Sequence, residues 1–128
     1  MKNTIVEKLE KERLKNFARL TMASSKFSAN EIVPKLKKTV LDSCGDITSV
    51  SNTFVVMRDG YNNEVLQPVI IADNDNRYVD GSTCYSQKCI EGYLRKNGFA
   101  VEWADDGYLR YGIDSVPVRK LTVSYKII

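Results

Sequence analysis

The stretch TFVVMRDGYNNEVLQPVII, residues 53–71, decides the fold, because the hydrophobic pattern changes here from helical spacing to strand spacing. Both ends are rich in β-branched residues, and the DGYNNE segment between them is typical of a turn. The stretch therefore predicts a β-hairpin with strands at 53–58 and 65–71. Because proline cannot donate to a strand ladder, Pro68 favours an edge position or a bulge for the second strand.

Downstream of the hairpin, the sequence predicts one helix and further strands. The polar segment ADNDNRYVDGS, residues 72–82, predicts a surface loop, and residues 82–97 predict a helix that ends at Asn97-Gly98. Three strands are then predicted, at FAVEWA (99–104), YLRYGI (108–113) and VRKLTVSYKII (118–128). The segment ADDG, residues 104–107, predicts a tight turn between the first two of them.

Upstream of the hairpin, the sequence predicts two helices. The first spans residues 3–24 and has an apolar face made of Ile5, Val6, Leu9, Phe17 and Leu20. The segment SSKFS, residues 24–28, predicts a break, after which Ser28 and Glu31 have the form of a capping box that starts the second helix. Gly45 is well placed as the left-handed residue after this helix.

The predicted order is α-α-β-β-α-β-β-β, which indicates an α+β fold with a mostly antiparallel sheet packed by helices on one face. A chain of 128 residues has the size of one ordinary domain, so we expect a single domain over residues 1–128. Within it, residues 1–45 form a basic helical pair, and residues 46–128 form the sheet with one inserted helix.

The composition argues against several functional classes. No apolar run approaches the roughly 18 residues that span a bilayer, and the charged N-terminus differs from a secretory signal. A cytoplasmic location is therefore expected, which would be the host cytosol for a phage-encoded chain. Histidine is absent, which removes the commonest general base and zinc ligand. We expect no enzymatic activity, no cofactor and no metal site, and we expect Cys44, Cys84 and Cys89 to be reduced thiols.

Charge is divided unevenly along the chain. Residues 1–40 hold ten Lys and Arg against four acidic residues, whereas residues 41–107 hold five against eleven. The first predicted helix carries a basic stripe nearly opposite its apolar face, which the second helix could extend; the candidate residues are Lys8, Lys11, Lys15, Arg19, Lys26, Lys35 and Lys38. The position of the stripe fits a solvated helix face, but its uniform sign also fits contact with phosphates or with an acidic protein.

Aromatic residues in the acidic part of the chain offer a second candidate surface. Tyrosine is common at the centres of protein-binding sites, and Tyr61 and Tyr78 fall in predicted turns and loops, where they would be exposed. Strand alternation instead places Trp103 and Tyr111 in the core or against a neighbouring strand.

Two functional hypotheses follow. In the first, the protein is a small non-enzymatic binding module that docks on a larger protein or complex and inhibits or adapts it. This profile is typical of accessory proteins of phages and mobile elements, including inhibitors of host defence. In the second, the basic stripe binds the phosphates of DNA or RNA, although the marks of known nucleic-acid modules are missing. The sequence leaves the oligomeric state open, since an exposed sheet edge could pair two copies.

Overall fold

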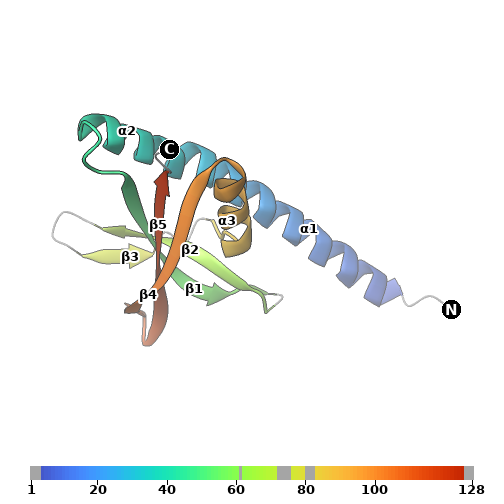
Figure 1. Ribbon diagram of the computed structural model, residues 1–128. Helices are drawn as coiled ribbons and strands as arrows, with labels where there is room; N and C mark the ends of the chain where they lie inside the picture. The colour runs from blue at the N-terminus through green and yellow to red at the C-terminus, as the bar shows by residue number, and fades with distance from the viewer. Residues whose placement is uncertain (1–3, 61, 72–75, 80–82, 126–128) are drawn as a thin grey trace.

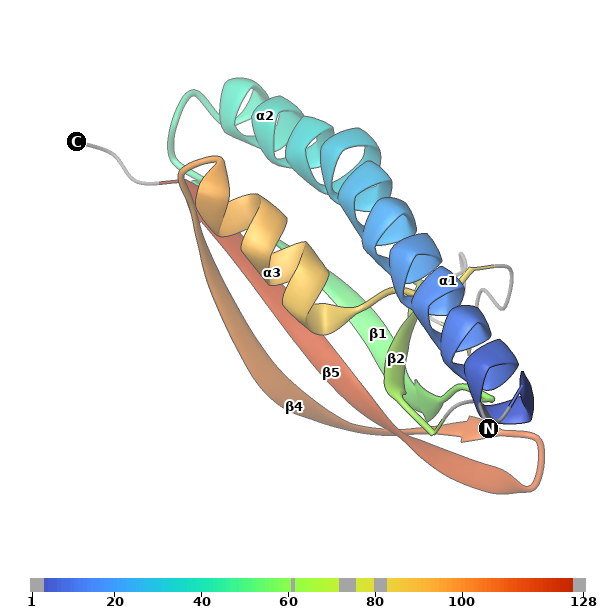
Figure 2. The same ribbon diagram turned by 90° about the vertical axis from the view of Figure 1, so that its right-hand side faces the viewer.

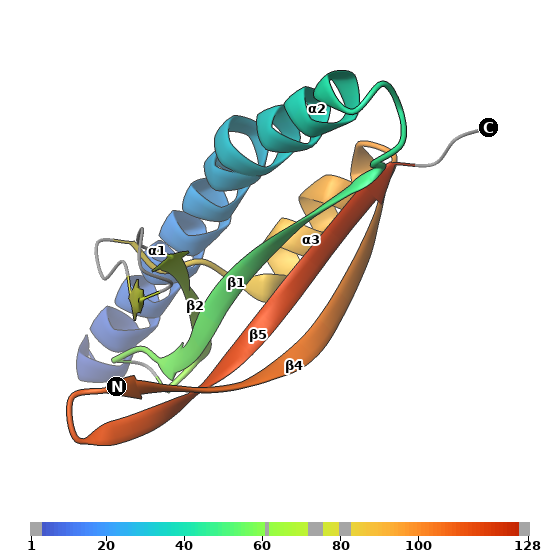
Figure 3. The ribbon, with the colours of Figure 1, turned by 90° about the vertical axis from the view of Figure 1, so that its left-hand side faces the viewer.

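The computed structural model describes residues 4–60, 62–71, 76–79 and 83–125, and these residues adopt an α+β fold (Figure 1). The elements in chain order are α1 (Thr4–Phe27), a π-helical turn (Ser28–Ile32), α2 (Val33–Asp42), β1 (Ser49–Arg58), β2 (Glu64–Ile71), β3 (Arg77–Val79), α3 (Gln87–Lys96), β4 (Phe99–Tyr111) and β5 (Asp114–Tyr125). The helices lie on one face of the sheet, as Figures 2 and 3 show from opposite sides. The predicted fold class is therefore confirmed.

The described strands form one antiparallel sheet in the order β3-β2-β1-β5-β4. The predicted hairpin is present as β1 and β2, but β2 is an inner strand rather than an edge strand. Its Pro68 stands opposite Phe54, at the end of the β1–β2 ladder. On the edge of β2 that faces away from β1, the backbone of Leu66 pairs with Tyr85, and β3 pairs with β2 from Val69 onwards. By strand alternation the Pro68 nitrogen faces this same edge. Pro68 therefore lies on β2 between the residue that pairs with Tyr85 and the residues that pair with β3.

The predicted break between two helices is wrong. Residues 24–28 stay helical, and a single π turn joins α1 to α2. The two serines do not cap a helix; instead Ser24 Oγ donates to the carbonyl of Leu20 at 2.6 Å, and Ser28 Oγ donates to the carbonyl of Ser24 at 2.8 Å. Serine hydroxyls can bond back to the preceding turn in this way, so the same residue type fits both a cap and a helix interior.

The C-terminal part of the sheet contains two long strands where three were predicted. The segment ADDG does not turn the chain; Gly107 has φ +81° at a bulge where the β4–β5 register shifts between Asp105 and Tyr108. The turn follows instead at Gly112, with φ +66°. The predicted loop after β2 also contains the short strand β3, while residues 72–75 and 80–82 lie outside the described residues. The left-handed Gly45 is confirmed, with φ +87°.

The main core lies between the helices and the sheet. Buried aliphatic and aromatic side chains meet there from the π turn, α2, α3 and four strands; they are Ile32, Leu36, Val50, Phe54, Leu66, Ile90, Leu94, Val101, Leu121 and Val123. Phe27 extends this core by stacking on Tyr85, with ring centroids 4.4 Å apart. Trp103 packs against Phe54 at 6.2 Å, as its predicted core position requires.

A smaller apolar cluster lies on the other face of the sheet. Val55, Val65 and Val118 are at most 1% exposed but lie outside the main core, and Val55 and Val118 are direct cross-strand partners. The sheet curls around this side, as the approach of its two edge strands shows: Arg77 of β3 and Asp106 of β4 come within 4.0 Å of each other. In a flat sheet, strands at the two edges would be about 19 Å apart.

Candidate interaction surface on helix α1

Helix α1 has little contact with its own chain. Of its 24 residues, all of them described, Ser24 is the only one that is buried. The helix packs on α3 through its last turns, where the Cys89 thiol donates to Thr21 Oγ1 at 3.5 Å and the Ser86 N–H donates to Ser24 Oγ at 2.8 Å. Residues 4–17, here called the outer half of α1, run past the strands in Figure 1.

The predicted apolar face of α1 is mostly exposed. Leu9 is 58% exposed and Phe17 is 63% exposed, although both lie on the face that the sequence would turn toward a core. Ile5 and Val6 are also exposed, at 70% and 56%. This face becomes covered where the helix reaches α3, the element on which its last turns pack. In proteins, helix stability comes mainly from burying such a face.

The basic stripe predicted from the sequence is exposed in full. Lys8, Lys11, Lys15, Arg19, Lys26, Lys35 and Lys38 all lie at the surface. Within the described residues, no carboxylate forms an ion pair with any of them. Lys35 differs from the other six cations, because its ammonium group already donates to the carbonyl of Ser51 on β1 at 3.0 Å. The stripe therefore remains on α1, with Lys38 beyond the π turn.

Of the two tyrosine candidates, Tyr78 is not brought to this surface. Tyr78 lies on β3 and is 51% exposed, as its predicted surface position requires. Tyr61 lies outside the described residues.

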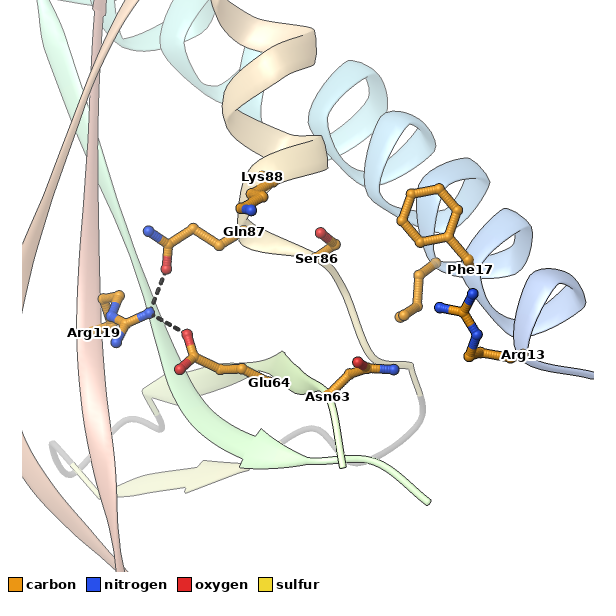
Figure 4. A pocket seen from close by; sticks show the side chains of 9 residues that line it. Arg13, Phe17, Asn63, Glu64, Ser86, Gln87, Lys88 and Arg119 are labelled. Atoms are coloured by element: carbon orange, nitrogen blue, oxygen red, sulfur yellow. Dashed lines mark hydrogen bonds and ion pairs between the residues drawn. The ribbon is translucent and has the colours of Figure 1, made fainter. Parts of the chain in front are cut away.

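A cleft of about 460 Å³ opens at the base of the outer half, between α1, the β1–β2 turn, the start of α3 and β5 (Figure 4). Its walls are formed by Arg13, Phe17, Leu20, Asn63, Glu64, Ser86, Gln87, Lys88 and Arg119. Arg13 and Phe17 form one wall in Figure 4, and Arg119 lies on the opposite side. Asn16 holds α1 near this cleft, because its amide donates to Asp59 Oδ2 at 3.0 Å.

The cleft contains three cations and one carboxylate. Arg119 donates to Glu64 at 2.7 Å and also to Gln87, so its guanidinium is fixed at the inner side of the cleft. Arg13 pairs with Glu10 at 2.5 Å, and this hydrogen bond, helped by the charge of the guanidinium, lowers the pKa of the Glu10 carboxyl and raises the pKa of Arg13. Lys88 forms no ion pair with a described carboxylate.

The cysteines and acidic residues do not form a second site. No three His, Cys, Asp or Glu side chains in the described part of the chain are grouped closely enough to hold a metal ion. All three cysteines are free thiols. Cys84 Sγ accepts a hydrogen bond from the Gln67 amide at 3.3 Å, and Cys89 contacts α1. None of the described helices has the length and apolar character needed to cross a bilayer.

Sequence reasoning missed the cleft, because its charged residues are far apart in the chain and each looks like an ordinary surface residue. Arg13 is not part of the predicted basic stripe, and it lies on the side of α1 that borders the cleft. Comparisons with models of protein families, with curated proteins and with solved structures find no match.

Proposed function

We propose that the protein is a non-enzymatic binding module that acts in the cytoplasm and docks on another protein through the apolar face of the outer half of α1. Docking would inhibit or adapt that protein. One observation carries the proposal: a helix of 24 residues has a single buried residue, while its apolar side chains lie at the surface. A partner that covers this face would supply the burial that the chain itself does not supply.

The chemistry of the helix indicates what kind of partner fits. An exposed apolar face on a helix of net positive charge matches a partner that has an apolar groove and acidic residues around it. A second copy of the chain fits less well, since α1 carries six Lys and Arg against three Glu, and pairing two copies of α1 would bring like net charges together. We therefore favour a different, acidic protein.

The test is affinity capture from nuclease-treated lysate with three forms of the protein: wild type, Leu9→Glu with Phe17→Glu, and Ile113→Glu. Ile113 is 97% exposed and lies far from α1 in the turn after β4, so it controls for the loss of any exposed apolar side chain. We expect a discrete protein that is captured by the wild type and by Ile113→Glu but is lost, at least tenfold, with the α1 variant. Circular dichroism checks that each form is folded.

The proposal is overturned if the α1 variant captures the same proteins as the wild type. It is also overturned if the wild type captures nothing beyond what a tagged control captures.

A second candidate function is binding of nucleic acid through the basic stripe. The observation in its favour is that the cations of the stripe are exposed and lack described acidic partners. Phosphate contacts would make affinity fall steeply with salt and would show little sequence preference. Because the stripe and the apolar face lie on opposite sides of α1, the two functions can be separated by mutation.

Binding to labelled DNA and RNA at low and moderate salt tests this second function. Lys11→Glu with Lys15→Glu should abolish binding, whereas Lys96→Glu with Lys120→Glu, which changes the net charge equally at exposed positions off the stripe, should reduce it only a little. Equal losses from both pairs would mean that only the net charge matters and that the stripe is not a specific site.

A further inference from the structure

The cleft and the exposed face of α1 form one continuous surface. Phe17 belongs to both, because it lies on the apolar face of the outer half and also lines the cleft. A protein segment laid along Leu9 and Phe17 would therefore continue into the space beside Arg13, Lys88 and Arg119. The following inference rests on the proposed function and specifies the chemistry of the partner.

The charges in the cleft select an anion. Its cations come from three elements, Arg13 from α1, Lys88 from α3 and Arg119 from β5, and among the described residues of its lining Glu64 is the only acidic one. The Arg119 side chain is only 23% exposed, so water screens its charge less than it screens the cations of the stripe. Glu64 and Gln87 orient this guanidinium (Figure 4), Glu10 pairs with Arg13, and Lys88 has no ion pair with a described carboxylate.

We propose that the cleft binds the carboxylate of an Asp or Glu side chain of the partner protein, while an adjacent apolar residue of the same segment packs on Phe17. A carboxylate forms strong, directional hydrogen bonds with arginine and lysine. A nucleic-acid backbone fits less well, because the cleft is also lined by the apolar Phe17 and Leu20, on which an apolar residue beside a carboxylate can pack and from which a chain of phosphates would gain nothing.

The probe is a synthetic 12-residue peptide of alternating Glu-Glu and Leu-Leu pairs, titrated into the full-length labelled protein and followed by NMR. The matched control peptide carries Gln in place of each Glu. We expect saturable shifts at the Lys88 amide and at the Arg119 Nε–H with the Glu peptide, and binding at least about tenfold weaker with the Gln peptide.

Two variants with the same change of charge separate a specific site from general attraction. Lys88→Glu should weaken binding of the Glu peptide about tenfold, whereas Lys96→Glu, at the other end of α3, should change it less than twofold. Both side chains are exposed, so both variants should fold like the wild type.

Several results would overturn the inference: no shift at Lys88 and Arg119 with the Glu peptide, equal binding of the Gln peptide, or equal effects of the two variants. Stronger shifts at the cleft with a single-stranded oligonucleotide would assign it to phosphates, and shifts reproduced by unlabelled protein alone would assign it to a second copy. If the peptide test fails, the proposed function still stands provided that capture of the partner protein requires Leu9 and Phe17 and is unchanged by Lys88→Glu.

Discussion

At the scale of single residues, Ser24 connects two helices. Its hydroxyl donates to the carbonyl of Leu20 and accepts from the N–H of Ser86, the residue that caps α3. Ser24→Ala should lower the free energy of unfolding by about 1–2 kcal/mol, because the Ser86 N–H loses its acceptor in a partly buried place. Urea denaturation measures the change. Ser25→Ala is the matched control, and an equal loss in both variants would contradict this role of Ser24.

Two glycines should respond to alanine in opposite directions. Gly107 has φ +81° in the bulge of β4, so Gly107→Ala should destabilise the protein by about 1 kcal/mol. Gly92 lies within α3, where an added methyl group would meet nothing within 4 Å, so Gly92→Ala should stabilise the protein by about 0.5–1 kcal/mol. Thermal unfolding of the two variants checks both signs. A stabilising Gly107→Ala would mean that ADDG is not a left-handed bulge.

The Glu10–Arg13 pair gives a prediction about pH. Because Arg13 lowers the pKa of the Glu10 carboxyl in the folded protein, the small stability it contributes is present above the unfolded pKa and is lost as pH falls through the folded pKa. Arg13→Gln should return the pKa of Glu10 toward its ordinary value, as measured by NMR titration of the carboxyl carbon. Lys11→Gln removes a charge from the same helix without that hydrogen bond and should have a smaller effect.

The sequence was least informative at this scale. It predicted the surface positions of Lys8 and Tyr78 correctly, because charge and polarity of the neighbouring residues decide exposure. It could not bring Arg13, Lys88 and Arg119 together, because that requires the register of β5 and the docking of two helices. The two roles of a serine, as a cap and as a helix-interior donor, also look alike in a sequence, which is why the break at Ser24–Ser28 was predicted wrongly.

At the scale of elements, α1 should have two halves of different stability. The outer half has no buried residue, so its amide hydrogens from Lys8 to Lys15 should exchange with solvent at least about tenfold faster than those from Ser24 to Phe27. Hydrogen exchange followed by mass spectrometry measures the difference. Addition of the captured partner should slow exchange in the outer half and leave α3 unchanged. Uniform protection along α1 without a partner would contradict this account.

Periodicity predicted most of the elements because it depends on neighbouring residues. The helices, the β1–β2 hairpin and the last strand were placed correctly to within a few residues. Two of the errors show the limit of a local pattern. Gly107 suggested a turn, although the same left-handed residue also suits a bulge inside a longer strand. The apolar spacing of α1 also suggested burial, although spacing shows only that a helix has an apolar face and not what covers that face.

At the scale of the whole molecule, the curled sheet has two apolar sides, and the side away from the helices should contribute to stability. Val118→Ala should lower the free energy of unfolding by about 2 kcal/mol, because Val118 is 1% exposed and packs in register with Val55. Val116→Ala, at a half-buried position on the same face of β5, should cost less than about 1 kcal/mol. Equal small losses, measured by urea denaturation, would mean that the sheet is open on that side.

The π turn between α1 and α2 has a consequence for tolerance of insertions and deletions. In a helix each residue turns the chain by about 100°, so loss of one residue from Ser28–Ile32 would rotate all of α1 about its axis while α2 kept its place on β1. Phe17 would then point away from the cleft, although α2 and the sheet would be unchanged. The direction in which the exposed face of α1 points therefore depends on the number of residues in this one turn, and deletion of a single codon there would change it.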